Sequence, residues 1–304
     1  MHIAISFDQN FITPTYVFLT SVFDNNKSEK ISFHAIATGV SDKDKQEITS
    51  YIQQHGADII YYTIDDKNLS SFIVPEHSYY TVATYYRLFF PSLVPDHVQQ
   101  LLYIDTDTVV VGDLSSLYQM DISPYPVAAA LDTIVTTRPD LGIDQQGHYF
   151  NAGVLLINIP TWRKQKISER SIQFLMEFPE KIKWVDQDAL NAVLYRNVYK
   201  LEGGYNITFY DIPQELPRSK YKEFIADKYI IHYTTGLHKP WSMLGENKFR
   251  YIYHDYLKKS PRKDEKKYKG YKPDLKTVSF FLRVRLLEYL YDYPAIIKLL
   301  KGSR

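Results

Sequence analysis

Cysteine is absent from this chain of 304 residues. Its absence excludes disulfide bonds, thiolate zinc sites and thiol nucleophiles, and with them the class of small secreted proteins held together by disulfides. A reducing compartment such as the cytoplasm is the expected location. The composition is otherwise ordinary, with 45% apolar and 23% charged residues, so a chain of this length can bury a substantial core.

Long apolar runs are also missing. No uninterrupted stretch reaches the ~18–20 residues that cross a bilayer. Residues 1–8 lead directly into a strand-like pattern, without the basic start and apolar block of a signal peptide. A soluble protein is therefore expected, with one qualification at its C-terminal end.

The chain as a whole lacks an excess of charge of one sign, with 36 Lys and Arg against 35 Asp and Glu, but the two signs are unevenly placed. Lys258–Arg304 carries 14 basic and 5 acidic residues, which leaves 22 basic and 30 acidic residues in 1–257. An acidic body argues against nucleic-acid binding, and a basic tail favours contact with an anionic surface. We therefore expect a folded domain at 1–257 and a basic linker with a helical tail at 258–304.

The tail contains an apolar segment, Thr277–Tyr293, on which Arg285, Glu288 and Asp292 share one helical face. Two interpretations stay open. The helix packs back on the domain, or it lies in a membrane interface, where each nearby Lys or Arg adds ~1 kcal/mol on an anionic leaflet. The second interpretation would make the protein peripheral on the inner face of the cell membrane.

Short apolar runs alternate with helical patterns along residues 1–257, which predicts an α/β fold with a largely parallel sheet covered by helices on both faces. Ligands of such folds bind beyond the carboxyl ends of the strands, where several acidic residues fall. Strands are predicted at His2–Asp8, Ile31–Thr38, Ala57–Ile64, Leu101–Asp105, Val109–Val111, Val127–Leu131, Gly153–Asn158 and Tyr229–Tyr233, and helices at Thr13–Asn25, Ser41–His55, Thr81–Phe90, Thr161–Phe178 and Asp186–Tyr195.

Two carboxylates two positions apart follow a predicted strand. Asp105 and Asp107 stand in the sequence LLYIDTDTVVV, between two apolar runs. On an extended chain both side chains would point to the same face, roughly 6–7 Å apart. A divalent cation can take oxygens from both, whereas a buried pair without a cation would keep one carboxyl protonated. A metal site and an acidic turn both fit this segment taken alone.

A second polar segment, IIHYTTGLHKPW, begins in the last predicted strand. It places His232 at the strand end, then a glycine turn and Lys239. His232 can complete a metal site and Lys239 can neutralise a phosphate; a core histidine and a surface lysine are the alternative. A set of carboxylates and an imidazole shifts the favoured metal from Mg²⁺ towards Mn²⁺.

A third polar segment, WVDQDALNAVL, opens a predicted helix. Asp186 stands at or near the helix N-terminus, a usual capping position. Asp186, Gln187 and Asp188 are more polar groups than a cap needs. Capping and ligand binding both stay open for this segment.

Together these segments resemble glycosyltransferase family 8, whose members are retaining enzymes of the GT-A fold and include bacterial lipopolysaccharide α-galactosyl- and glucosyltransferases and glycogenin. The resemblance runs from about Met1 to Tyr256 and implies a Rossmann-like mixed sheet flanked by helices, and a hexosyltransferase that uses a UDP-sugar. It rests on four motifs in this order: Asp105-Thr106-Asp107, the run NAGVLLIN that starts at Asn151, Asp186-Gln187-Asp188, and His232 followed by Lys239-Pro240-Trp241.

The resemblance also implies the roles of individual residues. Asp105, Asp107 and His232 would hold Mn²⁺, or Mg²⁺ in its place, against the nucleotide diphosphate. Lys239 would contact phosphate. The other implied donor-site residues are Asp8 and Asn10 around the uracil and ribose, Arg87 as organiser of the site, Thr106 between the motif aspartates, and Asp132, Asn151, Asp186 and Gln187 at the sugar.

One spacing departs from the family pattern. The family reads H-x-x-G-x-x-K-P-W, and this chain reads H-x-x-x-G-x-x-K-P-W, with one extra residue before Gly236. A local bulge is expected to let His232 and Lys239 still reach the diphosphate. The assignment of Gly236 as a backbone contact depends on how that bulge lies.

The expected reaction follows from the same resemblance. Cleavage at the anomeric carbon builds negative charge on the leaving UDP, which the metal and Lys239 would stabilise, and positive charge on the sugar. The residue in the place of a nucleophile is Gln187, whose neutral carbonyl oxygen is a poor one. We therefore expect front-face attack in which a leaving phosphate oxygen accepts the acceptor's proton, Gln187 stabilises the sugar cation and Asp186 holds sugar hydroxyls.

UDP-galactose or UDP-glucose is the expected donor, and a lipid-linked or cell-envelope saccharide, as in lipopolysaccharide synthesis, is the expected acceptor. Two other classes stay open. A sugar nucleotidyltransferase normally carries a Gly-rich loop after the first strand, where this chain has Phe7-Asp8-Gln9-Asn10. A non-catalytic saccharide-binding relative should lack part of the metal set.

Overall fold

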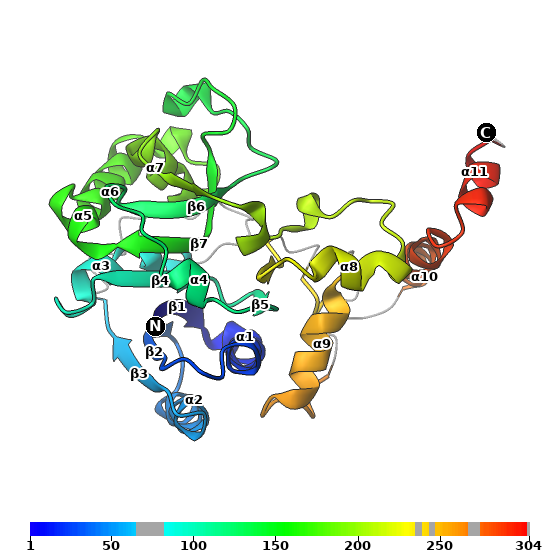
Figure 1. The fold of residues 1–304 in the computed structure, drawn as a ribbon, viewed down its shortest axis with the longest axis horizontal. Coiled ribbons are helices and arrows are strands. Elements are labelled where there is room, and N and C mark those ends of the chain that lie inside the picture. The colour runs from blue at the N-terminus through cyan, green and yellow to red at the C-terminus, as the bar shows by residue number, and fades with distance from the viewer. Residues whose placement is uncertain (65–81, 235–238, 243–246, 267–273, 303–304) are drawn as a thin grey trace.

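The computed structural model of the chain describes residues 1–64, 82–234, 239–242, 247–266 and 274–302. Figure 1 shows an α/β body and two C-terminal helices that extend away from it.

The body is built on a seven-stranded sheet of order β3-β2-β1-β4-β7-β6-β8. Among these strands β7 alone runs antiparallel to its neighbours. The prediction of an α/β fold with a largely parallel sheet is thereby confirmed. The strands are β1 (His2–Asp8), β2 (Ser32–Thr38), β3 (Asp58–Tyr62), β4 (Gln100–Ile104), β6 (Val127–Leu131), β7 (Phe150–Asn158) and β8 (Tyr199–Leu201).

Helices cover both faces of this sheet because successive side chains of each buried strand point to opposite sides. On β4, Leu102 and Ile104 pack into the core beneath α1 and α2, whereas Leu101 and Tyr103 pack into the core on the other face. The helices are α1 (Ile12–Asn25) and α2 (Asp42–Gln54) on one side, and α3 (Phe90–Leu93), α5 (Ile159–Lys164), α6 (Ile167–Glu177) and α7 (Val185–Leu194) on the other (Figure 1).

A second, two-stranded sheet stands next to the main one. It pairs β5 (Thr108–Val110) antiparallel with β9 (Ile230–His232), and Thr108 lies opposite His232. These strands are more than a hundred residues apart in the sequence. Their pairing brings the histidine of one motif beside the aspartates of another.

Two predicted helices differ from the structure. The helix expected at Thr81–Phe90, a range that ends just before Pro91, is a 3-10 helix at Val82–Leu88, and α3 then begins with Pro91 in its first turn. The N–H groups of a first helical turn have no acceptor within the helix, so a proline there loses no hydrogen bond. Pro91 therefore starts a helix here rather than ending one. The single helix expected at Thr161–Phe178 is broken into α5 and α6 at Lys166, whose φ is 53°.

Two further details of the fold escaped the sequence. Helix α1 begins one residue before Thr13, after a 3-10 turn at Gln9–Phe11 that the Asp8 side chain caps. Strand β8 was not predicted, because three residues are too few to show a period.

Helix α9 (Arg250–Lys259) packs on α1, with Val17 in contact with the cluster that holds Tyr253. Beyond it, Arg262 forms an ion pair with Asp44 of α2 at 3.4 Å. The start of the basic segment therefore lies on the body. The division into 1–257 and 258–304 stays a prediction, and α9 extends across its boundary.

Helix α10 (Leu275–Leu290) accounts for the predicted apolar segment, and α11 (Pro294–Gly302) follows it. Glu288 binds both terminal nitrogens of Arg250 at 2.7 Å, and Asp292 accepts from the Ser219 hydroxyl at 2.6 Å. The predicted polar face thus contacts the body. In the part of the chain that the structure describes, no helix has the length and apolar composition needed to cross a membrane.

Candidate active site

The two motif aspartates lie in a turn between β4 and β5. The Thr108 hydroxyl donates to the Asp105 backbone oxygen at 2.8 Å, which closes the turn. The chain is therefore bent at this point rather than extended. The bend turns both carboxylates towards His232 at the end of β9.

Asp105, Asp107 and His232 form a cluster suited to a divalent cation. One ligand atom from each lies within 4.8 Å of the others. His232 Nε2 is 3.2 Å from Asp107 Oδ1 and 3.7 Å from Asp105 Oδ2. Asp107 Oδ1 is buried and accepts no well-formed hydrogen bond. A buried carboxylate oxygen without a hydrogen bond is available to a divalent cation. The carboxylates suit both Mn²⁺ and Mg²⁺, and the imidazole favours Mn²⁺.

Gly153 makes room for this cluster. A β-carbon at this position of β7 would lie 2.1 Å from His232 Cε1, far inside contact distance. Only a residue without a side chain lets the histidine approach the strand. Gly153 belongs to the NAGVLLIN motif, but its packing role was not predicted; a glycine inside an apolar strand is the signal that indicates close approach.

Lys239 lies on the opposite side of Asp107. Its ammonium group forms a close ion pair with Asp107 Oδ2. Burial alone would raise the pKa of Asp107, but Lys239 and His232 outweigh burial and hold that pKa below its usual value. Lys239 therefore lies next to the three candidate metal ligands, as the sequence predicted. Gly236, predicted as a backbone contact in this motif, lies outside the described residues.

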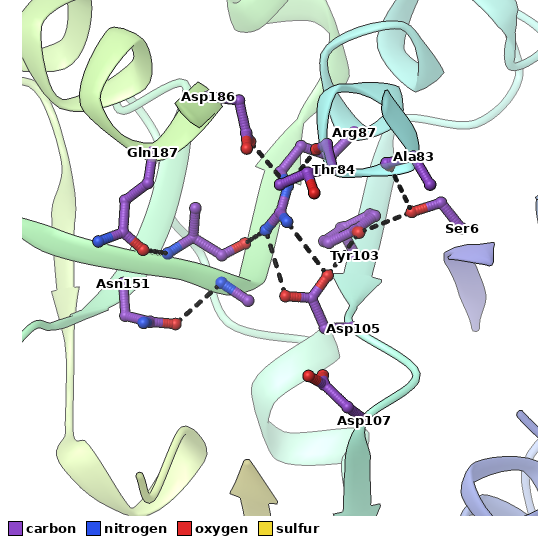
Figure 2. A network of polar contacts seen from close by, with 12 residues as sticks. Ser6, Ala83, Thr84, Arg87, Tyr103, Asp105, Asp107, Asn151, Asp186 and Gln187 are labelled. Carbon is purple, nitrogen blue, oxygen red and sulfur yellow. Dashed lines mark hydrogen bonds and ion pairs between the residues drawn. The ribbon is translucent and has the colours of Figure 1, made fainter. Parts of the chain in front are cut away.

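Arg87 joins two of the motifs. Its guanidinium is buried, lies 3.2 Å from Asp105 Oδ1 and 2.8 Å from Asp186 Oδ2, and donates to the backbone oxygen of Ala152 (Figure 2). A planar guanidinium can serve several acceptors at once. Arg87 thus holds the start of α7, the start of β7 and the aspartate turn in one arrangement.

Asp186 is almost completely buried, with 1% of its surface exposed. Burial raises the pKa of this carboxyl to about 7, although Arg87 opposes the shift. The helix cap considered for Asp186 is not formed, because α7 has no side-chain capping hydrogen bond. Asp188 Oδ2 accepts from the amides of Lys183 and Trp184, both at 2.7 Å. Of the two aspartates, the first faces the site and the second holds the helix start.

Gln187 of α7 contacts both strand β7 and Asp132, another residue predicted at the sugar. Its Oε1 accepts the Ala152 amide at 3.0 Å, and its Nε2 donates to Asp132 Oδ2 at 3.2 Å. Figure 2 shows the Gln187 side chain pointing to the backbone of β7, close to Asn151. The structure therefore brings Asp132 and Gln187 into contact. Asn151 precedes Ala152, the partner of Gln187, on β7.

Asp8 is the last residue of β1, the neighbour of β4 in the sheet, and Asn10 lies two residues beyond it. Asp8 Oδ1 accepts the Asn10 amide at 2.7 Å, so the two form one small turn at the carboxyl end of the strand. Phe11, the next residue, has its ring centroid 5.9 Å from Lys239 Nζ. Thr106 is buried within the aspartate turn. All four residues lie at the edge where the sequence predicted a ligand.

Two contacts to the metal set were not predicted. The Tyr103 hydroxyl donates to Asp105 Oδ1 at 2.6 Å and contacts the Ser6 hydroxyl at 2.9 Å. Asn206 Oδ1 lies 2.9 Å from His232 Nδ1. A tyrosine in an apolar strand and a lone asparagine in an irregular segment carry no pattern that would have marked either residue.

The family model described as Glycosyl transferase family 8 matches residues 2–245. General stress protein A of Bacillus subtilis (strain 168) is 32% identical over 268 residues, covering 84% of this chain and 93% of that protein. The lipopolysaccharide 1,3-galactosyltransferase of Salmonella typhimurium is 29% identical over 252 residues, covering 80% of this chain and 74% of that protein.

Among solved structures, the galactosyltransferase LgtC, crystallised with donor and acceptor sugar analogues, is similar to this chain with a TM-score of 0.74. The likeness covers 86% of this chain and 96% of LgtC at 22% identity. It shows a shared fold, and the predicted GT-A fold is confirmed.

Proposed function

The chain belongs to glycosyltransferase family 8, and we propose that it is a retaining, metal-dependent hexosyltransferase that moves galactose or glucose from a UDP-sugar to a saccharide acceptor. The observation that carries this proposal is the convergence of Asp105, Asp107, His232 and Lys239 at the carboxyl edge of the sheet. Three metal ligands and one ammonium group form a site for a nucleoside diphosphate rather than for a neutral ligand.

Asp105, Asp107 and His232 would hold a divalent cation, with Mn²⁺ favoured by the imidazole. When bound, such a cation stabilises negative charge on the leaving diphosphate as a Lewis acid. Lys239 then supplies a fixed positive charge beside the same oxygens. In this reading Lys239 exchanges its contact with Asp107 for one with phosphate.

The remaining site residues bind the two ends of the donor. Asp8 and Asn10 receive the uridine at the end of β1, with Thr106 in the adjoining turn. Asp132, Asn151 and Asp186 receive the hexose hydroxyls, and Arg87 holds their elements in place. The predicted backbone contact of Gly236 with the phosphates is kept as part of the proposal, and Gly236 lies outside the described residues.

We propose that the configuration is retained, as the resemblance to the family implies, and that front-face attack achieves this. The bond from the anomeric carbon to the UDP oxygen breaks while the acceptor hydroxyl attacks from the same face. The hydroxyl proton passes to the leaving phosphate oxygen. Gln187 Oε1 stabilises the positive sugar through its dipole, in an orientation fixed because the Ala152 amide can only donate to it.

The acceptor is proposed to be a cell-envelope glycan, because lipopolysaccharide hexosyltransferases are among the similar proteins. The basic tail, 258–304, is proposed to lie on the inner, anionic face of the membrane. Exposed apolar side chains of α10, α11 and the turn between them support this second point: Leu275, Phe280, Leu282, Leu286, Tyr289, Tyr293, Ile296 and Leu299. Such a surface beside lysines and arginines suits an anionic membrane interface.

Calorimetric titration of UDP tests the proposed site directly. With Mn²⁺ present we expect binding that excess EDTA abolishes and that Asp107→Asn weakens at least ~10-fold, since loss of a metal ligand should cost no less than loss of its outer-shell partner. Asp58→Asn, at an exposed carboxylate of edge strand β3, serves as the control and should bind normally. UDP binding of equal strength with and without a metal would contradict the proposal.

A further inference from the structure

Asn206 is a buried asparagine that connects His232 to Asn151. Its Oδ1 lies 2.9 Å from His232 Nδ1, and its Nδ2 lies 2.9 Å from Asn151 Oδ1. Only 4% of its surface is exposed. The contact to His232 is on the imidazole nitrogen that faces away from Asp105 and Asp107, so Asn206 stands behind the metal set.

The direction of each hydrogen bond in this chain follows from one backbone amide. Gly153 N–H lies 3.0 Å from Asn151 Oδ1, and an amide N–H can only donate. The Asn151 atom at this place is therefore an acceptor, and the Asn206 atom that faces it must be the donating nitrogen. The carbonyl oxygen of Asn206 is left for His232, whose Nδ1 must carry a proton to donate to it.

The same chain fixes the other imidazole nitrogen. In a neutral imidazole a proton on Nδ1 leaves Nε2 with a free lone pair. That lone pair is directed at the Asp105 and Asp107 oxygens, 3.7 and 3.2 Å away, where a cation would bind. With the opposite tautomer, Nε2–H would point into the cation's place.

Asn206 is itself held by the backbone around it. The amide of Ile207 donates to Ile230 at 2.9 Å, and the amide of His232 donates back to Ile207 at 2.7 Å. Asn206 is therefore tied to the strand that carries the histidine. Gly153 closes the other side of the imidazole, since a β-carbon there would overlap it.

We propose that Asn206 is a positioning residue that holds His232 in the Nδ1–H tautomer with Nε2 facing the two aspartates. The inference rests on the proposed metal site and adds to it how the histidine is made ready. It also limits Asn151, because both lone pairs of its Oδ1 are used by Gly153 and Asn206. Asn151 therefore meets a hexose hydroxyl with its Nδ2, as a donor.

Nitrogen-15 NMR of the metal-free protein, labelled at histidine and held near pH 8, reads the tautomer of His232 directly. In the wild type we expect Nδ1 to carry a proton that it donates to Asn206 Oδ1. Asn206→Leu, which keeps the size but removes the acceptor, should abolish the signal of this hydrogen-bonded Nδ1–H. Mn²⁺ affinity, followed by electron paramagnetic resonance, should fall ~10–100-fold, as for other outer-shell partners of metal-binding histidines.

Two further variants separate this role from a general effect on folding. Asn206→Asp keeps an acceptor for Nδ1–H, so it should retain the tautomer and bind Mn²⁺ within about threefold of the wild type, below the ~10-fold loss of a missing partner. Asn26→Leu removes another buried asparagine with two hydrogen bonds, to Val22 and Leu114, and should leave both measurements unchanged.

A wild-type His232 without a proton on Nδ1 overturns the inference, as does an Asn206→Leu protein that binds Mn²⁺ as tightly as the wild type. If the leucine variant does not fold, the NMR of the wild type and the Mn²⁺ affinity of Asn206→Asp still test the role of Asn206. Absence of Mn²⁺ binding by the wild type would instead contradict the proposed function, and the NMR result would still judge Asn206.

Discussion

Gly153 and His232 approach so closely that a β-carbon on the glycine would lie 2.1 Å from the imidazole Cε1 and 2.9 Å from Asp105 Oδ2. Gly153→Ala should therefore push the histidine or the aspartate out of the cluster. We expect Mn²⁺ affinity to fall at least ~10-fold and the free energy of unfolding to fall by ~1–3 kcal/mol, the usual cost of overpacking.

Equilibrium Mn²⁺ titration and urea unfolding measure the two effects of that variant. Gly203→Ala is the matched control, because a β-carbon there would meet nothing within 4 Å. Unchanged Mn²⁺ affinity in Gly153→Ala would mean that the cluster does not depend on this close packing.

Tyr103→Phe should loosen Asp105 while the core stays filled. The variant removes the 2.6 Å hydrogen bond to Asp105 Oδ1 and keeps the ring, which is buried in the sheet core. We expect Mn²⁺ affinity to fall ~10-fold at a stability cost of ~1 kcal/mol. Tyr51→Phe, which loses a hydroxyl contact with Thr20 at 2.8 Å, controls for a buried tyrosine away from the site. Equal Mn²⁺ affinity of the two variants would show that the Tyr103 hydroxyl does not position Asp105 for metal binding.

Gln187→Ala should slow hexose transfer without abolishing it. Its amide is expected to stabilise charge rather than to form a covalent bond, and loss of one such group costs ~100-fold or more in turnover. Turnover at saturating donor and UDP-sugar affinity are both measured, with the exposed Gln173→Ala as control. Complete loss of transfer with intact donor binding would favour a covalent role for this position and count against front-face attack.

The buried carboxyl of Asp186 predicts a pH-dependent stability. Its pKa is about 7 in the folded protein against a usual 3.8, so between these values the folded state binds the proton and the unfolded state has lost it. The contribution is complete below about pH 4 and is lost as the pH rises to about 7, by ~1.4 kcal/mol per pH unit at most. Asp186→Asn removes it.

Urea unfolding of wild type and Asp186→Asn at several pH values tests this. The wild type should lose stability relative to the variant as the pH rises from 4 to 7, and the difference should then level off. A difference that stays constant over this window would show that Asp186 is ionised throughout, paired with Arg87.

The exposed leucines of α10 should carry the proposed membrane contact. Leu282 and Leu286 are each 60% exposed. Replacing both by Ser should weaken binding to vesicles of phosphatidylcholine with phosphatidylglycerol at least ~10-fold, since burial of one Leu is worth ~1.5–3 kcal/mol. Met176→Ser on α6, at 59% exposure, is the control, and UDP release should be unaffected in both proteins. Vesicle binding that survives the double substitution would exclude this face.

The sequence predicted the metal cluster because its members are ligand types at strand ends. Asp105 and Asp107 follow one apolar strand and His232 ends another, and the pairing of β5 with β9 brings them together. The resemblance to family 8 supplied the link between these distant motifs. Neither composition nor periodicity would have paired two three-residue strands.

The parts of the site that escaped prediction depend on tertiary contacts alone. Asn206 is a single polar residue in an irregular segment, and its partner is known only once Ile207 is placed beside β9. Val185, at φ 42°, enters α7 through a backbone region that β-branched residues rarely adopt, and no pattern indicated this. Such residues hold the ligands rather than contact the substrate, so their chemistry does not distinguish them in a sequence.

Release of UDP from UDP-galactose and UDP-glucose, assayed in parallel with Mn²⁺ and then with excess EDTA, tests the central claim most directly. Slow transfer to water should occur even without the natural acceptor. The account predicts metal-dependent release from one of these donors, lost in Asp107→Asn and retained in Asp58→Asn. Release that continues undiminished in EDTA, or in Asp107→Asn, would contradict a transferase built on Asp105, Asp107 and His232.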